Sequence, residues 1–98
     1  MSLLVNLQLK VKPGQVPDLL ETFKGILPGT RAYEGCRWVK LVANVEGEHI
    51  LEAVSQWDSK EHYEAYLKWR TETGVLAALL EFLDEDPVFR FLPIEQEY

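Results

Sequence analysis

Apolar and polar residues alternate at the start of the chain, and this pattern predicts a β-strand. From residue 3 to residue 11 every second residue is apolar, and Asn6, Gln8 and Lys10 lie between them. A period of two is typical of a strand that buries one face and leaves the other more polar. We expect this strand to cover residues 3–12, because Pro13-Gly14 breaks the pattern.

The apolar spacing then changes to that of an amphipathic helix, with apolar residues on one face at Val16, Leu19, Leu20, Phe23, Ile26 and Leu27. Pro17 and Asp18 suit its first turn, where the proline N–H is not needed and a carboxylate faces the positive end of the helix dipole. We expect Pro28-Gly29 to end or kink this helix, and residues 30–33 to add one turn.

The second half of the chain predicts two strands, helical segments and a last strand. Residues 36–45 and 49–57 have strand character, and we expect a hairpin turn between them in which Gly47 has a positive φ. Asp58 and Ser59 are suitable N-caps for a helix from residue 60 to about residue 70–73. Beyond these, the sequence predicts an interruption at Gly74, a helical segment at 75–83 and a strand at 88–94.

This β-α-β-β-α-β order predicts an α+β ferredoxin-like fold with a four-stranded antiparallel sheet, formed by one domain over residues 1–98. The helices of such a fold cover one face of the sheet only. Since the chain is small and rich in large apolar residues, we expect a second copy to cover the other face, giving a homodimeric α+β barrel.

Composition and charge exclude several classes of function. The formal charge of −6 and a pI near 4.8 leave no basic stripe for nucleic acid. The one cysteine excludes an internal disulfide, and it leaves no Cys cluster for a metal. With two histidines far apart, we expect no metal site. We also expect no membrane partner and a cytoplasmic location, because the chain shows neither a targeting segment nor a membrane-spanning apolar run.

Several local patterns together resemble the antibiotic biosynthesis monooxygenase family. The first strand ends in Lys12-Pro13-Gly14 directly before a helix, and residues 30–36 are similar to the family's R-x-x-x-G-C entry into its second strand. Residues 56–60 are similar to its W-x-S pattern between the third strand and the second helix. Residues 66–70 and 73–76 have the form seen in one branch. These patterns follow the family's order over nearly the whole chain.

The resemblance implies a dimer with a pocket between each sheet and its helices. In characterised relatives this pocket oxidises phenols, hydroquinones or anthrones with O₂ without flavin or metal, whereas other branches cleave haem or isomerise small sugars. We therefore expect a cofactor-independent monooxygenase of a small aromatic molecule. A non-enzymatic binding or scaffold domain and a non-redox isomerase remain alternatives, because one fold supports many functions.

The resemblance also implies candidates for chemistry. Trp57 occupies the position of the family's pocket tryptophan, where the indole can donate a hydrogen bond and stack on a ring; core packing is the alternative. Asn6 is near an asparagine of relatives that binds substrate or oxygen, although a one-residue shift would place it on the other face. His62 is a candidate base if it faces the pocket, and a solvated residue otherwise. Leu67 stands where the haem-cleaving and quinol-oxidising branches carry histidine. This departure argues against haem cleavage and leaves any histidine-based mechanism in doubt.

The remaining aromatic and basic residues are candidates for binding a flat substrate or, alternatively, for core packing. Arg31 and Arg70 can neutralise a phenolate. The alternative is that they are solvated surface side chains or form ion pairs with Glu34 or Glu72. We expect no cofactor, and the predicted substrate-binding residues are Tyr33, Trp38, Tyr66, Trp69 and Arg70.

Overall fold

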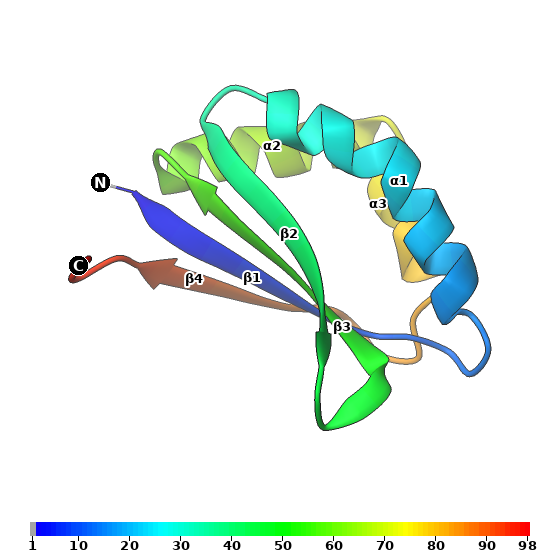
Figure 1. The fold of residues 1–98 in the computed structure, drawn as a ribbon. Helices are drawn as coiled ribbons and strands as arrows, with labels where there is room; N and C mark the ends of the chain where they lie inside the picture. Colours follow the sequence, from blue (N-terminus) through cyan, green and yellow to red (C-terminus); the bar gives the residue numbers. More distant parts are fainter. Residues whose placement is uncertain (1) are drawn as a thin grey trace.

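The computed structural model describes residues 2–98 and confirms the predicted order of elements. A short third helix follows the second before the chain returns to the sheet. In chain order the elements are β1 (Leu3–Lys10), α1 (Val16–Ala32), β2 (Cys36–Asn44), β3 (Gly47–Trp57), α2 (Lys60–Glu72), α3 (Val75–Leu80) and β4 (Val88–Pro93), as labelled in Figure 1.

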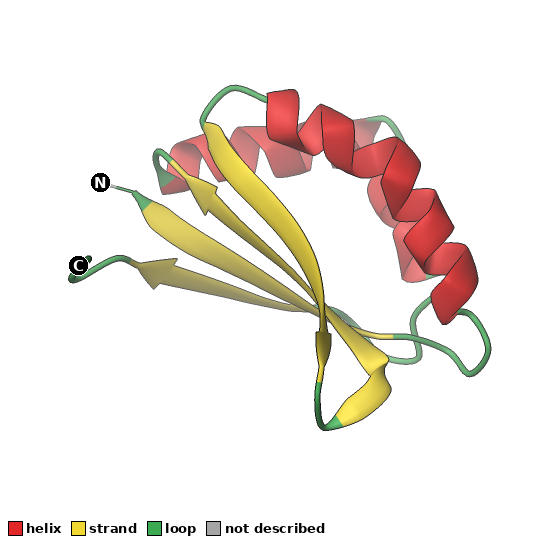
Figure 2. Cartoon of the chain, in the orientation of Figure 1, coloured by secondary structure: helices red, strands yellow, loops and turns green. Residues whose placement is uncertain are grey.

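The four strands form one antiparallel sheet in the order β2-β3-β1-β4. Val5 of β1 pairs with Ser55 of β3 on one side and with Phe91 of β4 on the other. Because side chains alternate along a strand, registered residues share a face. All helices lie over the face that carries Val5, and the opposite face is uncovered (Figure 2). This is the ferredoxin-like arrangement predicted from the sequence.

The core lies between the helices and the covered face of the sheet. One cluster of buried side chains packs beneath α1 and α3, and another packs beneath α2 around Trp57, whose side chain is inaccessible to solvent. The first cluster contains Leu9, Val11, Leu19, Phe23, Leu51, Leu79 and Leu83, and the second contains Leu3, Val5, Cys36, Trp57, Tyr63 and Tyr66.

Helix α1 does not end at Pro28-Gly29 but continues to Ala32. A proline inside a helix leaves the carbonyl four residues earlier without its partner. Here that carbonyl belongs to Lys24, and both Lys24 and Pro28 are exposed, so water can satisfy it. The helix curves along its length, as a proline-containing helix does (Figure 1).

The hairpin between β2 and β3 differs from the prediction, because Gly47 does not have a positive φ. Asn44 pairs with Gly47, and the turn consists of the two residues between them. The Asn44 Oδ1 accepts a hydrogen bond from the Glu46 N–H at 2.8 Å. This side-chain cap stabilises the turn without left-handed backbone, and the β2–β3 register shifts beside it.

The predicted start of α2 is confirmed. Ser59 is the N-cap, and its Oγ accepts from the His62 N–H at 3.2 Å. Gly74, with φ +83°, separates α2 from α3. Helix α3 ends at Leu80, whereas the sequence predicted that this helical segment continues to residue 83.

Strand β4 is one of the two edges of the sheet. It begins directly after Pro87, and Pro93 is its last residue. Val88 and Leu92 of this strand are exposed, and they point to the uncovered face because their partners are Gln8 and Leu4. Within residues 2–98 no helix is long and apolar enough to cross a membrane.

Candidate active site

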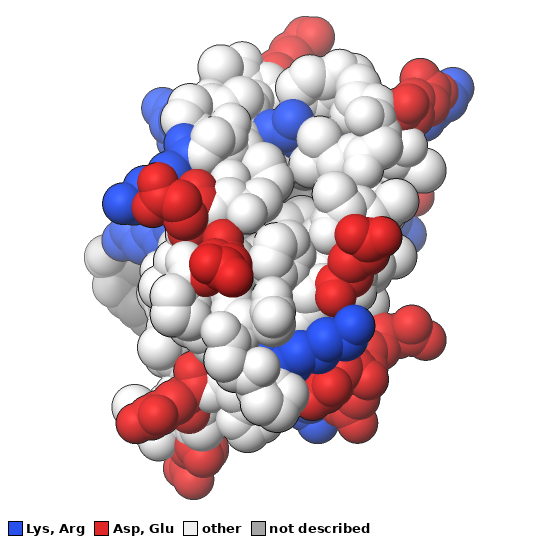
Figure 3. Space-filling view, turned by 90° about the vertical axis from the view of Figure 1, so that its right-hand side faces the viewer, with Lys and Arg blue, Asp and Glu red and all other residues white. Residues whose placement is uncertain are grey.

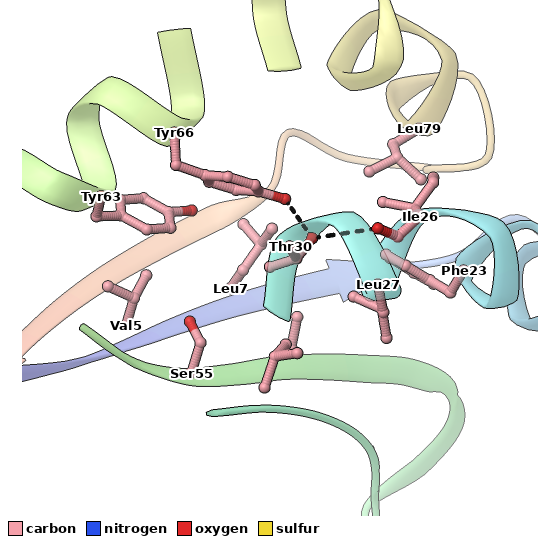
Figure 4. Close-up of a pocket in the computed structure, with 12 residues that line it drawn as sticks. Val5, Leu7, Phe23, Ile26, Leu27, Thr30, Ser55, Tyr63, Tyr66 and Leu79 are labelled. Carbon is pink, nitrogen blue, oxygen red and sulfur yellow. Dashed lines mark hydrogen bonds between the residues drawn. The ribbon is translucent and has the colours of Figure 1, made fainter. Parts of the chain in front are cut away.

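A small cavity of about 50 Å³ lies between the covered face of the sheet and the helices (Figure 4). Every helix contributes to it, since α1 packs against β2, α2 packs against β3, and α3 supplies one of the lining side chains. Most of the lining is apolar, and its polar groups are hydroxyls from Thr30, Ser55, Tyr63 and Tyr66. The apolar residues are Val5, Leu7, Phe23, Ile26, Leu27, Val39, Ala53 and Leu79.

A second cavity of about 40 Å³ lies beside the first. The two share a wall made by Leu7, Tyr63, Tyr66 and Leu79, because these four side chains line both. The other lining residues of the second cavity are Leu67, Arg70, Val75 and Leu76. The first cavity is therefore the apolar part of the site, and the second contains a cationic side chain.

A buried polar cluster joins α1 to α2 next to the cavities. The hydroxyls of Tyr66 and Thr30 lie 2.6 Å apart, and Arg70 Nε donates to the Tyr66 hydroxyl at 3.1 Å. Arg70 Nη2 donates to the Ile26 carbonyl at 2.7 Å and to Thr30 Oγ1 at 3.4 Å. The side chains of Thr30, Tyr66 and Arg70 are all buried. Satisfied buried polar groups of this kind fix the relative position of two helices.

Gly29 allows the arginine to reach α1. A Cβ atom at this position would lie 3.0 Å from Arg70 Nη2. Without it, the guanidinium sits against the helix backbone and stacks on Trp69 at 4.2 Å. The expected surface ion pair of Arg70 with Glu72 is wrong, because the side chain points into the protein. Arg31 donates to the Cys36 carbonyl at 3.1 Å.

Tyr63 places a hydroxyl at the wall between the cavities, and this hydroxyl has no hydrogen-bond partner within residues 2–98. Figure 4 shows it pointing along the same direction as the Tyr66 hydroxyl. Burial, with a smaller contribution from Tyr66, raises the pKa of Tyr63 far above its usual range. A tyrosine is neutral near pH 7 even without this shift, and burial extends the neutral form to higher pH, so the phenol keeps a proton to donate.

Trp57 lies one layer behind the cavity. Its indole Nε1 donates to Ser55 Oγ at 2.8 Å, and Ser55 lines the cavity. Its ring lies 5.2 Å from that of Tyr63 and 5.0 Å from that of Tyr66. The tryptophan thus supports three side chains of the lining.

Asn6 lies on the uncovered face of the sheet, so it does not line the cavity. Its Nδ2 donates to Glu52 Oε1 at 2.8 Å, and Asn44 Nδ2 donates to Glu52 Oε2 at 2.8 Å. These hydrogen bonds, that of Asn6 first, lower the pKa of Glu52. The Asn6 Oδ1 is buried and has no partner within the described residues. Trp38 lies on the same face, where its indole donates to Gln56 at 2.8 Å.

His62 lines neither cavity. It packs on Gly35, where a Cβ atom would lie 2.5 Å from the imidazole, and its Nδ1 is 2.7 Å from Ser59 Oγ. Tyr33 and Trp69 stack on each other at 5.2 Å beside the polar cluster. Of the predicted site residues, Tyr66 and Arg70 line a cavity.

The polar lining residues that the sequence did not predict as site residues are Thr30, Ser55 and Tyr63. Tyr63 is three positions before Tyr66 on a helix, and Ser55 is two positions before Trp57 on a strand, so each shares a face with a predicted residue. That spacing was the available signal. Thr30 had no comparable signal, because its partner Tyr66 lies on another helix.

Charged side chains do not form a basic surface on the side of the molecule drawn in Figure 3, where acidic and basic residues are interspersed among uncharged ones. Within residues 2–98 no group of three or more His, Cys, Asp or Glu side chains is placed to hold a metal ion.

A family model described as antibiotic biosynthesis monooxygenase matches residues 2–74. Among curated proteins no relative matches the chain.

Several solved structures share the whole fold. A conserved protein from Methanosarcina mazei Go1 is 19% identical with a TM-score of 0.87, covering 95% of this chain and 92% of its own. Rv0793 from Mycobacterium tuberculosis is 18% identical with a TM-score of 0.86 and coverages of 99% and 98%. A crystal structure named as an antibiotic biosynthesis monooxygenase is 14% identical with a TM-score of 0.84 and coverages of 96% and 99%. At these identities the likeness establishes the fold alone.

Proposed function

Because the chain belongs to the antibiotic biosynthesis monooxygenase family, we propose that it is a cofactor-independent monooxygenase of a phenolic, hydroquinone or anthrone-type molecule. The observation that carries the proposal is the apolar cavity into which Tyr63 directs an unpartnered hydroxyl. An apolar lining excludes water from a reactive intermediate, and a neutral phenol donates a hydrogen bond to a substrate oxygen.

The proposed reaction balances without an added reductant. In an anthrone-type substrate, loss of a proton gives an electron-rich anion that passes an electron to O₂. The radical pair then combines at carbon. The O–O bond breaks, one oxygen atom remains as a carbonyl, and the other leaves as water with the two hydrogens of the methylene group. The substrate supplies all the electrons, so the protein only binds, orients and excludes water.

The size of the cavities sets a condition on binding. A cavity of about 150 Å³ holds a benzene ring in another protein, whereas the two cavities here have about 50 and 40 Å³. We propose that a substrate ring merges them by displacing Leu79 from the shared wall. Leu79 belongs to α3, which has only six residues and follows Gly74, so it is the part of the wall held by the shortest element.

The roles of the individual residues follow from their positions. We propose that Tyr63 donates to the substrate oxygen and that Trp57 positions Ser55, Tyr63 and Tyr66 around the ring. Catalytic roles for Trp57, Asn6 and His62 stay predictions, with Asn6 on the other face of the sheet. Leu67 lines the second cavity and contributes an apolar side chain to its wall.

We also propose that the chain forms a homodimer through the uncovered face of the sheet. Apolar side chains on this face are half-buried or exposed, and the buried Asn6 Oδ1 lacks a donor within the described residues. The sheet of a second copy would cover the apolar side chains and the Asn6 Oδ1. The apolar residues are Leu4, Trp38, Val42, Val54, Val88 and Leu92.

Oxygen uptake by metal-free protein with a panel of hydroquinones and anthrones tests the proposed activity. We expect uptake above the spontaneous rate and a loss of about 10²-fold in Tyr63→Phe, which removes only the free hydroxyl. Tyr33→Phe is the matched control, because its hydroxyl lies outside both cavities and makes a long 3.4 Å bond to the Ala65 carbonyl. Equal rates in wild type and Tyr63→Phe would contradict the role of Tyr63.

A small-molecule-binding domain without catalysis is the second candidate. It is favoured by the extensive pairing among Thr30, Tyr66 and Arg70, which leaves few polar groups free for chemistry. Quenching of tryptophan fluorescence by the same panel, with no oxygen uptake by any member, would establish this alternative.

A further inference from the structure

Arg70 carries a positive charge that the protein itself does not neutralise. Its side chain is buried, with 9% of the residue surface exposed, and no carboxylate lies within ion-pair distance in residues 2–98. The ion pairs of the described residues lie elsewhere, on exposed side chains such as Lys68 and Glu72. An arginine stays protonated in proteins, and a buried charge without a partner is unfavourable.

The hydrogen bonds of Arg70 go only to neutral groups. Nε and Nη2 donate to the Tyr66 hydroxyl, the Thr30 hydroxyl and the Ile26 carbonyl. Nη1 has no hydrogen-bond partner within residues 2–98. The guanidinium therefore keeps its charge and the free donors of Nη1, and a charged donor makes a stronger hydrogen bond to an oxyanion than a neutral donor does.

The buried side chain of Arg70 borders a cavity. Arg70 lines the second cavity, where the other groups are apolar except the hydroxyls of Tyr63 and Tyr66. These tyrosines are the titratable groups that line it with the arginine, and burial keeps Tyr63 neutral. No negative charge in the lining competes for the guanidinium.

We infer that the second cavity binds the anionic oxygen of a phenolate, with Arg70 as the residue that selects the anion over the neutral phenol. The ring occupies the space of the first cavity, and its oxygen reaches the second cavity where Leu79 is displaced from the shared wall. This inference specifies the ionisation state of the substrate and rests on the proposed function for the place of the ring. An opposite charge at close range lowers the pKa of a bound phenol.

A purely structural arginine would behave differently. The bond from Nη2 to the Ile26 carbonyl ties α2 to α1, and this tie requires a donor but no charge. Glutamine retains a donor and loses the charge, whereas lysine retains the charge. Comparing the two variants therefore separates anion selection from the link between helices.

The experiment uses para-nitrophenol, an electron-poor phenol that O₂ does not oxidise and whose anion absorbs visible light. The pKa of the bound phenol is read from absorbance against pH with protein in excess. We expect it to fall by about one unit in wild type, a tenfold preference for the anion. Arg70→Lys should retain most of the shift, and Arg70→Gln should abolish or reverse it. Lys68→Gln removes the same charge from an exposed site of α2 and should leave the shift unchanged.

Three results would overturn the inference: a bound pKa equal to or above that of free phenol, a lowered pKa that persists in Arg70→Gln, or no binding at millimolar concentration. Unfolding midpoints of all variants verify that they are folded. Because para-nitrophenol is not oxidised, a shift in pKa without oxygen uptake on the hydroquinone panel would remove the oxygenase proposal and leave the anion site intact.

Discussion

Glu52 receives two amide hydrogen bonds on the uncovered face of the sheet, and its pKa is lowered mainly by them. A carboxyl group whose pKa is lower in the folded than in the unfolded chain stabilises the fold above its unfolded pKa, near 4.5. This contribution is lost as the pH falls through the folded pKa.

We therefore expect Glu52→Gln to reduce the free energy of unfolding by about 1–2 kcal/mol at pH 7, because one carboxylate oxygen becomes an NH₂ group facing an asparagine donor. The deficit should shrink as the pH falls below about 4.5. Urea unfolding across this pH range measures it. Glu48→Gln, at an exposed position of the same strand, is the control, and an equal loss in both variants would refute the explanation.

Single residues were the least predictable level of this site. The sequence suggested Trp57 and Arg70 as site residues. A sequence pattern does not show, however, that the indole N–H of Trp57 already donates its hydrogen bond to Ser55. Arginine is mostly exposed in proteins, and this tendency favoured a surface ion pair for Arg70. The helix period carried the opposite signal, since Arg70 is four positions after Tyr66 and shares its buried face.

At the level of elements, the contact between α1 and α2 depends on the hydroxyl pair of Thr30 and Tyr66. We expect Thr30→Val to lower the free energy of unfolding by about 1–3 kcal/mol, because it removes a buried partner from Tyr66 and Arg70 while preserving side-chain shape. Chemical denaturation with an unchanged m-value measures this loss.

Thr22 provides the matched control for this change. It lies in the same helix, and its Oγ1 donates to the Asp18 carbonyl at 2.9 Å, but this bond is exposed. Thr22→Val should change the free energy of unfolding by no more than about 0.5 kcal/mol. If the two valine variants lose equal stability, the polar cluster is not what joins the helices.

The type and order of the elements followed from local patterns, since strand alternation and the Ser59 cap act within a few residues. The local differences at Pro28 and Gly47 had a common physical origin. Pro28 and Gly47 were read from their intrinsic preferences, but an exposed carbonyl at Lys24 and a side-chain cap from Asn44 removed the need for those conformations.

At the level of the whole molecule, the uncovered face predicts the state of association. We expect light scattering at micromolar concentration to give the mass of two chains. Val54→Lys, in the middle of this face opposite Asn6, should give a single chain, because a buried unpaired charge opposes association.

Leu20→Lys is the control for this experiment, because Leu20 is an exposed leucine of α1, away from the uncovered face of the sheet. It should associate like wild type. A single-chain mass for wild type, or equal dissociation of both lysine variants, would rule out this interface.

The cavities are also a property of the whole molecule, which is why the sequence could not predict their size. Their volume is the space left unfilled after side chains from three strands and three helices have packed together. No local sequence pattern determines the size of that space. The resemblance to the family predicted a pocket between sheet and helices. The division of that space into an apolar and a cationic part became visible only in the structure.

The prolines around β4 have a consequence for the behaviour of the protein at high concentration. An edge strand with exposed apolar side chains offers its free backbone groups to strands of other molecules, which is a route to aggregation. Pro87 and Pro93 have no N–H to donate and stand before and at the end of β4. They limit any such pairing to the residues between them, so they restrict growth of this edge into an intermolecular sheet.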